Sequence, residues 1–253
     1  MSYYDHIAKQ WHKATGYEGG AFKRLVLNDR ILQRIPDIDN HAILELGAGN
    51  GYFLPLMLRR FSGQIPTSVM VTDVSARLLE VAQRHFRISS AEYQVLDVGN
   101  QFPFESNRFD LILATMVFNE VPSHVFKNAL NECYRILSNE GCLLMTVLHP
   151  VFVNSLQKRG LLVGGPGVRH TMPGADNLRL PIVVRSHDSY RNSLVEAGFQ
   201  FEEEEVYPTP EVINIKTGLR YAGKGPLALI FHCKKISKCQ TMIAMPGSQN
   251  EKC

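Results

Sequence analysis

Residues 43–51, with the sequence ILELGAGNG, decide the fold predicted for this chain. Apolar residues alternate at its start, three glycines follow at every second position, and apolar residues then recur with helical spacing over 52–58. This pattern predicts a strand, a glycine turn and a helix. Gly47, Gly49 and Gly51 permit positive φ and lack the Cβ that would keep the backbone away from a ligand. Because the helix directs its free N–H groups toward the turn, a ligand-binding turn is favoured over a plain connection.

The glycine spacing distinguishes two kinds of nucleotide-like ligand. A dinucleotide fingerprint has Gly-x-Gly-x-x-Gly with an acid about 20 residues further on. Here the spacing is Gly-x-Gly-x-Gly, and Asp73 follows Gly51 by 22 residues. The acid fits both interpretations, whereas the glycines favour a ligand other than a dinucleotide. With Glu45 two residues ahead of the first glycine, the signature E-x-G-x-G-x-G resembles motif I of the class I S-adenosylmethionine (AdoMet) methyltransferases.

The composition limits the kinds of partner. Lys and Arg exceed Asp and Glu by three, and residues 234–253 carry that whole excess with four Lys and one Glu. The rest of the chain is near neutral, which predicts no nucleic-acid partner. Five cysteines without a Cys-x-x-Cys pair, no apolar run of about 18 residues and no signal peptide predict a cytoplasmic protein without a membrane partner. We expect one α/β domain with additions and no metal site.

Two further predicted strands end in an acid. Residues 69–73 end at Asp73, and a carboxylate at the carboxyl end of a parallel strand can accept hydrogen bonds from both ribose hydroxyls. Residues 93–97 end at Asp97. In the family that the chain resembles, an acid here accepts a hydrogen bond from the adenine amino group, and the next residue, Val98, packs on the ring. A helix cap at Asp73 and a turn starting at Asp97 are the alternatives.

Residues 109–115, FDLILAT, form a near-continuous apolar run that predicts a buried parallel strand. The Phe-Asp start matches the family's fourth motif. After it the chain reads Ala-Thr-Met-Val, in place of the Asp/Asn-Pro-Pro-aromatic tetrad of amino-methylating DNA enzymes, and no Pro-Cys nucleophile occurs in the matching region. Both differences argue against a nucleic-acid substrate. The strand end also lacks the acids with which aminopropyl transferases of the same fold bind a polyamine.

Polar residues that follow two strands are candidates for the acceptor site. Asn119 and Glu120 come just after residues 109–115, where the family faces the transferred methyl group, and His149 follows the predicted strand 142–148. Open α/β sheets bind ligands at the carboxyl ends of their strands. A hydroxyl acceptor needs a general base such as His149 or Glu120, whereas an amine needs only its neutral form. Nitrogen and oxygen acceptors both stay open.

Two segments are expected to cover the site. Residues 1–40 are helical in pattern and begin like the N-terminal cap of small-molecule methyltransferases, which implies that Tyr4 faces the cofactor. A helix packed outside the sheet is the alternative. Residues 151–184 are rich in glycine and proline and predict a lid inserted in the domain, with disorder as the alternative.

The last part of the chain predicts a hairpin and a tail. Residues 199–207 contain four consecutive glutamates, which a solvated edge strand can tolerate. Residues 226–232 are apolar and predict an interior strand, which matches the final hairpin of the family. Residues 236–253 lose periodicity and predict a flexible tail.

The resemblance covers residues 43–235 and implies a Rossmann-like α/β domain at 41–235. Its sheet would be seven-stranded and mixed, with six parallel strands and helices on both faces. The implied cofactor is S-adenosyl-L-methionine. The residues expected to bind it are Tyr4, Glu45, Gly47, Ala48, Gly49, Asp73, Val74, Asp97, Val98 and Thr115.

The implied function is AdoMet-dependent methyl transfer to a nitrogen or oxygen of a small-molecule metabolite, with specialised-metabolite biosynthesis as one setting. Methylation of a protein side chain and a non-catalytic AdoMet-binding module are the alternatives. A dehydrogenase is disfavoured by the glycine spacing and by the final hairpin.

Overall fold

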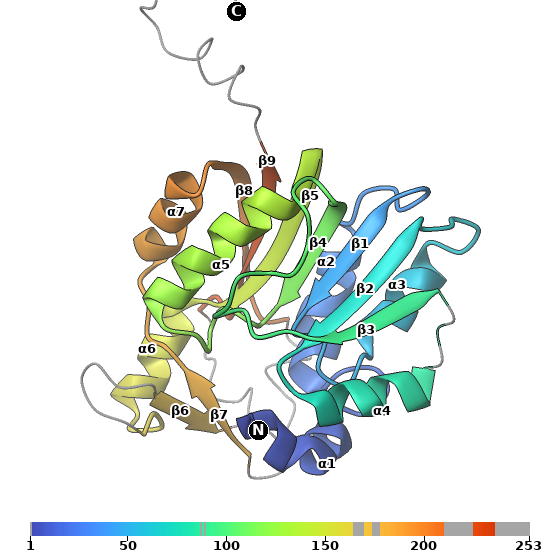
Figure 1. The fold of residues 1–253 in the computed structure, drawn as a ribbon. Coiled ribbons are helices and arrows are strands. Elements are labelled where there is room, and N and C mark those ends of the chain that lie inside the picture. The colour runs from blue at the N-terminus through green and yellow to red at the C-terminus, as the bar shows by residue number, and fades with distance from the viewer. Residues whose placement is uncertain are drawn as a thin grey trace, which may run out of the picture.

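The computed structural model of this protein describes residues 2–86, 88, 90–163, 170–173, 178–209 and 225–235. A seven-stranded sheet forms its centre, in the order β3-β2-β1-β4-β5-β9-β8 (Figure 1). The strands are β1 (Ala42–Leu46), β2 (Ser68–Asp73), β3 (Ala91–Val95), β4 (Phe109–Thr115), β5 (Leu137–Leu148), β8 (Phe199–Val206) and β9 (Ala228–Lys235). Only β9 runs antiparallel to its two neighbours, so the predicted mixed sheet with six parallel strands is confirmed.

Helices cover both faces of this sheet (Figure 1). The period of two along β1 explains why, since Ile43 packs into one apolar cluster and Leu44 into the other. The helices that follow the strands are α3 (Phe53–Arg60), α4 (Ala76–Phe86), α5 (Ser123–Ile136) and α7 (His187–Glu196). Ser186 accepts a hydrogen bond from the backbone N–H of Ser189 and caps α7.

The final hairpin has the predicted arrangement. The glutamate-rich strand β8 lies at the edge of the sheet, and β9 inserts between it and β5. Ala228, Leu229, Ile230 and Phe231 are fully buried in β9, whereas in β8 Glu202 and Glu205 are exposed and the two glutamates between them are partly buried. The charged edge therefore pairs on one side only, which protects it from adding a further strand.

The N-terminal region is broken into three helices, where the sequence predicted helical residues throughout. These are α1 (Tyr3–Thr15), the π-helical turn η1 (Lys23–Leu27) and α2 (Asn28–Leu32). The break falls at Gly16 and Gly19, both with positive φ. The start of α1 docks on the start of α4, because Oδ1 of Asp5 accepts hydrogen bonds from Ser75 Oγ at 2.7 Å and Arg77 N at 3.3 Å.

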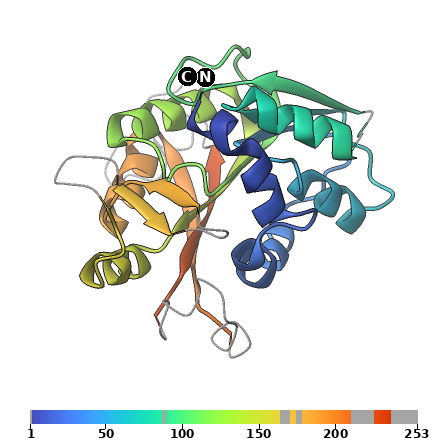
Figure 2. The ribbon, with the colours of Figure 1, turned by 90° about the horizontal axis from the view of Figure 1, so that it is seen from below.

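The segment predicted as an irregular lid holds regular structure in its described parts. It starts with α6 (Pro150–Lys158) and continues into the hairpin of β6 (His170–Pro173) and β7 (Arg179–Ile182). Pro150 at the first helical position and the His149 side chain as cap explain why a helix begins here. Figure 2 shows α1, α6 and the β6–β7 hairpin at the same end of the molecule.

Several strand boundaries differ from the prediction, and β9, for example, spans 228–235 instead of 226–232. β3 ends at Val95, two residues before Asp97, and β5 begins at Leu137 instead of Cys142. The earlier start of β5 is accommodated by a shift in register against β4 and by a positive φ of 70° at Glu140. The predicted tail, 236–253, lies outside the described residues. None of the helices in the described part of the chain has the length and apolar character needed to cross a membrane.

Candidate active site

A cavity of about 570 Å³ opens at the carboxyl ends of β1, β2 and β4. Its walls come from the glycine turn, the residues after β2, β3 and β4, the helices α1 and η1, and the α6 and β6–β7 segment. Most of the predicted site residues line it: Tyr4, Gly47, Ala48, Gly49, Asp73, Val74, Asp97, Val98, Thr115, Asn119 and Glu120. Glu45 and His149 are not among the described residues that form its wall.

The three glycines of the turn serve different purposes. A Cβ on Gly47 would lie 2.4 Å from Val117 Cγ2, and one on Gly51 would lie 2.6 Å from Ala82 Cβ in α4. Both positions also have positive φ. Steric packing thus requires glycine at Gly47 and Gly51, whatever binds at the turn. Gly49 faces α1, since a Cβ there would lie 3.2 Å from the indole nitrogen of Trp11.

Asp73 connects the glycine turn to the start of α4. Its Oδ2 accepts from the backbone N–H of Gly49 at 2.8 Å, and its Oδ1 accepts from that of Ser75 at 2.9 Å. Ser75 Oγ in turn accepts from the backbone N–H of Leu78 at 3.2 Å, so Ser75 caps α4. Burial raises the pKa of Asp73, and these two N–H groups oppose the rise. The carboxylate therefore shapes the turn and also faces the cavity.

Asp97 and Val98 lie beside Asp73. The Asp73 carbonyl oxygen accepts from the backbone N–H of Leu96 at 3.0 Å, which draws the end of β3 toward β2. Asp97 Oδ1 accepts from the backbone N–H of Gly99 at 2.8 Å, and Val98 is buried against the cavity. Asp97 therefore begins the predicted turn and also lines the cavity.

Glu45 lies behind the turn, with its side chain buried. Its Oε2 finds no hydrogen-bond partner among the described residues. Burial raises the pKa of Glu45 to about 7, and the Lys23 ammonium opposes this rise. The position follows from the period of two in β1, which turns Glu45 to the side of the sheet that Ile43 also faces.

Lys23 is a wall residue that sequence reasoning missed. It starts the π-helical turn η1, and its Nζ lies 5.2 Å from the centroid of the Tyr52 ring. Burial lowers the pKa of Lys23, while the carboxylates of Glu45 and Glu120 oppose this effect. A single lysine in a helical stretch is typical of a solvated face, so the sequence carries no signal for its position.

Tyr4 and Glu120 form a hydrogen-bonded pair in the cavity. The Tyr4 hydroxyl donates to Glu120 Oε2 at 2.6 Å. Burial, the Glu120 charge and this hydrogen bond raise the pKa of Tyr4 well above its ordinary value. The phenol therefore stays protonated at neutral pH and acts as a donor. The pair also fastens α1 to the loop after β4.

Asn119 and Arg185 hold that loop in place. Asn119 Nδ2 donates to the Met116 carbonyl at 3.2 Å, and its Oδ1 accepts from the backbone N–H of Leu148 at 2.7 Å. Arg185, which the sequence gave no reason to select, donates to the carbonyls of Phe118 and Val121 at 2.8 and 2.7 Å. The amide of Asn119 is thus engaged with the backbone, and its role is structural support for Glu120.

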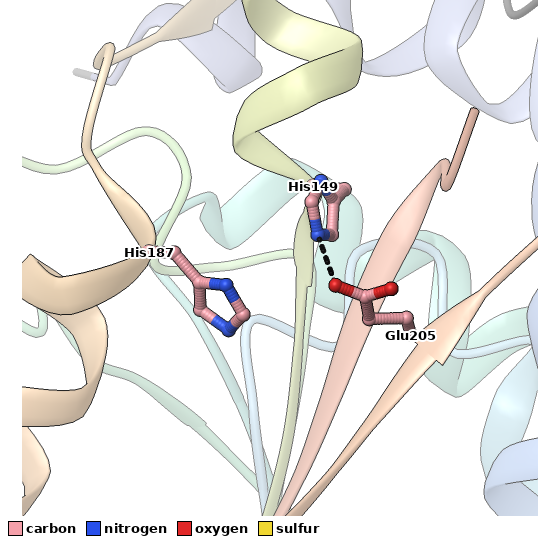
Figure 3. Close-up of side chains that lie close together, drawn as sticks. All are labelled: His149, His187 and Glu205. Atoms are coloured by element: carbon pink, nitrogen blue, oxygen red, sulfur yellow. Dashed lines mark hydrogen bonds and ion pairs between the residues drawn. The ribbon is translucent and has the colours of Figure 1, made fainter.

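His149 does not point into the cavity. Its Nδ1 accepts from the backbone N–H of Val151 at 3.1 Å, and its Nε2 lies 3.2 Å from Glu205 Oε1 (Figure 3). In the neutral ring the proton consequently sits on Nε2 and points to the carboxylate. His187 lies nearby, with ligand-type atoms of the three side chains within 4.8 Å of one another.

The contacts of His149 decide what it can do. With Nδ1 accepting and Nε2 donating, this tautomer has no lone pair left for a metal ion or a substrate proton. Burial lowers the pKa of His149, although Glu205 opposes this. The expectation that His149 faces the substrate is therefore not met by its position, because the residue caps α6 instead of turning toward the cavity.

The donor and acceptor groups of the wall fit AdoMet. Acids after two neighbouring strands offer acceptors for hydroxyl and amino groups, and the buried Glu45 oxygen without a partner can favour a positive group nearby. Residues 47–49 expose their backbone at the cavity surface. The large share of apolar and aromatic wall residues suits an adenine ring.

Comparisons with known proteins agree with this geometry. Residues 43–141 match a family described as a methyltransferase domain. The chain is 35% identical over 109 residues to "tRNA N(3)-methylcytidine methyltransferase Mettl2" of Drosophila melanogaster, covering 41% of this chain and 33% of that protein. It is 24% identical to a "Malonyl-[acyl-carrier protein] O-methyltransferase" of Marinomonas sp. over 58% of this chain and 53% of that protein. The chain thus spans about half or less of the length of these relatives.

The fold also has solved counterparts. A putative S-adenosylmethionine-dependent methyltransferase from Listeria monocytogenes superposes with a TM-score of 0.65 at 18% identity, covering 83% of this chain and 97% of that one. Residues 43–141 are thus similar to a methyltransferase domain, and the fold is similar to that of this solved methyltransferase.

Proposed function

We propose that this protein transfers the methyl group of AdoMet to a nitrogen or oxygen of a small molecule. One observation carries the proposal: a single cavity joins the acids Asp73 and Asp97 at one side to the Tyr4–Glu120 pair at the other. When bound, AdoMet supplies an electrophilic methyl carbon, to which the acceptor's lone pair bonds while the C–S electron pair stays on sulfur and the acceptor releases a proton. A metabolite of specialised biosynthesis is one acceptor of this kind.

The chain's own residues bind the two partners and position them. Asp73 accepts hydrogen bonds from ribose hydroxyls, and Asp97 accepts one from the adenine amino group. Val74, Val98 and Thr115 pack beside them, and residues 47–49 provide the backbone surface. Tyr4 also belongs to the cofactor-binding part of the cavity, and Glu45 contributes a buried carboxylate behind the glycine turn. Collinear placement of the reacting atoms is the main catalytic contribution in such a transfer.

Glu120 is the residue proposed to receive or orient the acceptor's proton. It lies on the loop after β4, which Asn119 and Arg185 fix from both sides. Tyr4 holds one of its carboxylate oxygens through a hydrogen bond of 2.6 Å. A carboxylate kept in one place in this way can accept a proton with little rearrangement.

Two segments are proposed to close the site: the N-terminal residues that precede the 41–235 domain, and the lid inserted in that domain. Residues 1–40 act as a cap, since α1 joins the cavity wall through Tyr4 and Trp11. Residues 151–184 act as a lid, since Phe152, Leu156 and Met172 line the same cavity. Such covers keep water from the charged reaction centre.

The charge of the wall supports a small molecule over RNA, although one relative is named as a tRNA methyltransferase. Among the described wall residues, Lys23 is the single basic one, against the acids Asp73, Asp97 and Glu120. A nucleic-acid site carries the opposite balance. Buried thiols at Cys133, Cys142 and Cys233 support a cytoplasmic, reducing environment.

Calorimetry tests the proposal directly. AdoMet and S-adenosylhomocysteine should bind, and NAD should not. Asp73→Asn should weaken AdoMet binding at least tenfold, because each hydrogen bond to a charged group is worth roughly 1.5–3 kcal/mol. Release of S-adenosylhomocysteine should then be measured with panels of small molecules, proteins and RNA. Binding without turnover on any panel would favour a non-catalytic module, and turnover on RNA or protein alone would contradict the proposal.

A further inference from the structure

The acceptor side of the cavity is walled by hydrocarbon. The end of β5, helix α6 and the β6–β7 hairpin contribute Leu148, Phe152, Leu156, Met172, Leu180 and Pro181. The start of α1 contacts this wall, since the Tyr3 hydroxyl donates to the Arg179 carbonyl at 2.6 Å. A molecule in this space therefore buries an apolar body, which is favourable in proportion to the area removed from water.

The charges of the cavity disfavour an anionic head group on that molecule. The described wall contains no arginine or histidine, and its single cation, Lys23, lies over the Tyr52 ring beside the glycine turn. Lys23 interacts there with the negative charges of Glu45, Glu120 and Asp73, so it is already balanced by three carboxylates. A carboxylate or phosphate at the acceptor side would instead face Glu120, and two like charges in a poorly solvated site repel strongly.

A cluster of three aromatic rings reaches the carboxylate of Glu120 through Tyr4. The Tyr4 ring, whose hydroxyl binds Glu120, packs edge to face against Tyr3 and Trp11, with centroid separations of 5.4 Å in both pairs. All three rings line the cavity. Ring faces and a carboxylate both attract an ammonium group, and the attraction increases where water is excluded.

We propose that the acceptor is a primary or secondary amine attached to an apolar body, which binds as an ammonium ion at Glu120. This inference rests on the proposed function and names the substrate class for it. The ammonium gives one proton to the Glu120 carboxylate, which leaves the nitrogen with a free lone pair. That pair forms the new N–C bond while the C–S electron pair stays on sulfur, and the Glu120 proton then passes to water.

The experiment uses octylamine, octanol and octanoate, which share a hydrocarbon body and differ in head group, together with butylamine. Their binding is measured by calorimetry on the full chain saturated with S-adenosylhomocysteine, so that no reaction occurs. Octylamine should bind at least tenfold more tightly than octanol, octanoate should bind most weakly, and butylamine should bind less tightly than octylamine. Turnover with AdoMet should follow the same order.

Variants separate the two parts of the inference. Glu120→Gln should remove most of the preference for amine over alcohol, and Tyr4→Phe should reduce it. Leu156→Asn should reduce the advantage of octylamine over butylamine and leave the head-group preference in place. Glu80→Gln, in an exposed pair with Arg84, is the matched control and should change neither. Bound S-adenosylhomocysteine reports that each variant is folded.

The outcomes distinguish the inference from the proposed function. If the protein fails to bind AdoMet or S-adenosylhomocysteine, the proposed function fails. If it binds them but prefers octanol or octanoate, or retains the amine preference in Glu120→Gln, the amine inference is wrong while the methyltransferase proposal stands.

Discussion

Glu45→Gln is expected to stabilise the unliganded protein at neutral pH. The substitution keeps the shape of a fully buried side chain and removes its charge. Burial raises the pKa of Glu45 from 4.5 to about 7. Because the folded pKa lies above the unfolded one, the folded state binds more protons between these values. The stability contributed by this group is therefore present below pH 4.5 and is lost as the pH rises to about 7.

The size of the effect follows from the shift. Each pKa unit corresponds to about 1.36 kcal/mol, so the ionised carboxylate costs roughly 3 kcal/mol at pH 8. Lys23 offsets part of the burial cost and is already included in the raised pKa. Urea unfolding of both proteins at pH 5 and pH 8 measures the difference. The advantage of Glu45→Gln should grow by roughly 2.5 kcal/mol between these two values of pH, because a small part of the effect is already present at pH 5.

A matched variant shows whether the effect is specific to the buried position. Glu80 lies in an exposed i,i+4 pair with Arg84, and such pairs contribute little. The unfolding free energy of Glu80→Gln should therefore differ from that of the unmodified protein by the same small amount at both values of pH. If the unfolding free energy of Glu45→Gln also changes with pH as that of the unmodified protein does, the Glu45 carboxylate is ionised in the folded state without penalty. A close ion pair with Lys23 would then explain the result.

Two further changes test other contacts of the structure. Burial lowers the pKa of His149 below its ordinary 6.5, so its contribution to stability is complete above that pH and declines as the pH falls toward the folded pKa. In His149→Gln, the free energy of unfolding should therefore fall less between pH 7 and pH 5 than in the unmodified protein. An equal fall in both proteins would contradict this. Gly51→Ala places a Cβ 2.6 Å from Ala82 at a φ of +76° and should cost roughly 2–5 kcal/mol in urea unfolding. Gly16→Ala, with open space and a φ of +60°, should lose only the backbone part, and an equal loss in both variants would show that contact with α4 is unimportant.

Local patterns were sufficient to predict the sheet. Strand β1, the turn after it and α3 follow from the change in hydrophobic period between residues 43 and 58, and β4 has the predicted bounds. The four glutamates of β8 and the apolar run of β9 predicted their places at the edge and inside the sheet. These features can be predicted because burial of one face of a helix or strand sets the spacing of its apolar residues along the sequence.

The positions of Asp73 and Asp97 on the cavity wall were predicted for a similar reason. Asp73 and Asp97 come after adjacent parallel strands, and the carboxyl ends of such strands meet at one edge of the sheet. The topology alone therefore brings these acids to the glycine turn. The exception is Glu45, which the alternation of β1 places behind the turn, where its charge interacts with that of Lys23 in η1.

By itself, the sequence determined the strands of the central sheet, the glycine turn and the acids at the ends of β2 and β3, whereas it did not predict α6 or the β6–β7 hairpin. Only the tertiary structure decided that Gly51 accommodates Ala82, that His149 caps α6, and that Lys23 and Arg185 serve the cavity and its loop. The physical reason is that periodicity records whether a side chain is buried, whereas its partner depends on how separate elements pack. Tyr4 and Glu120 lie 116 residues apart in the chain, and their hydrogen bond exists because α1 folds back over the carboxyl ends of the strands.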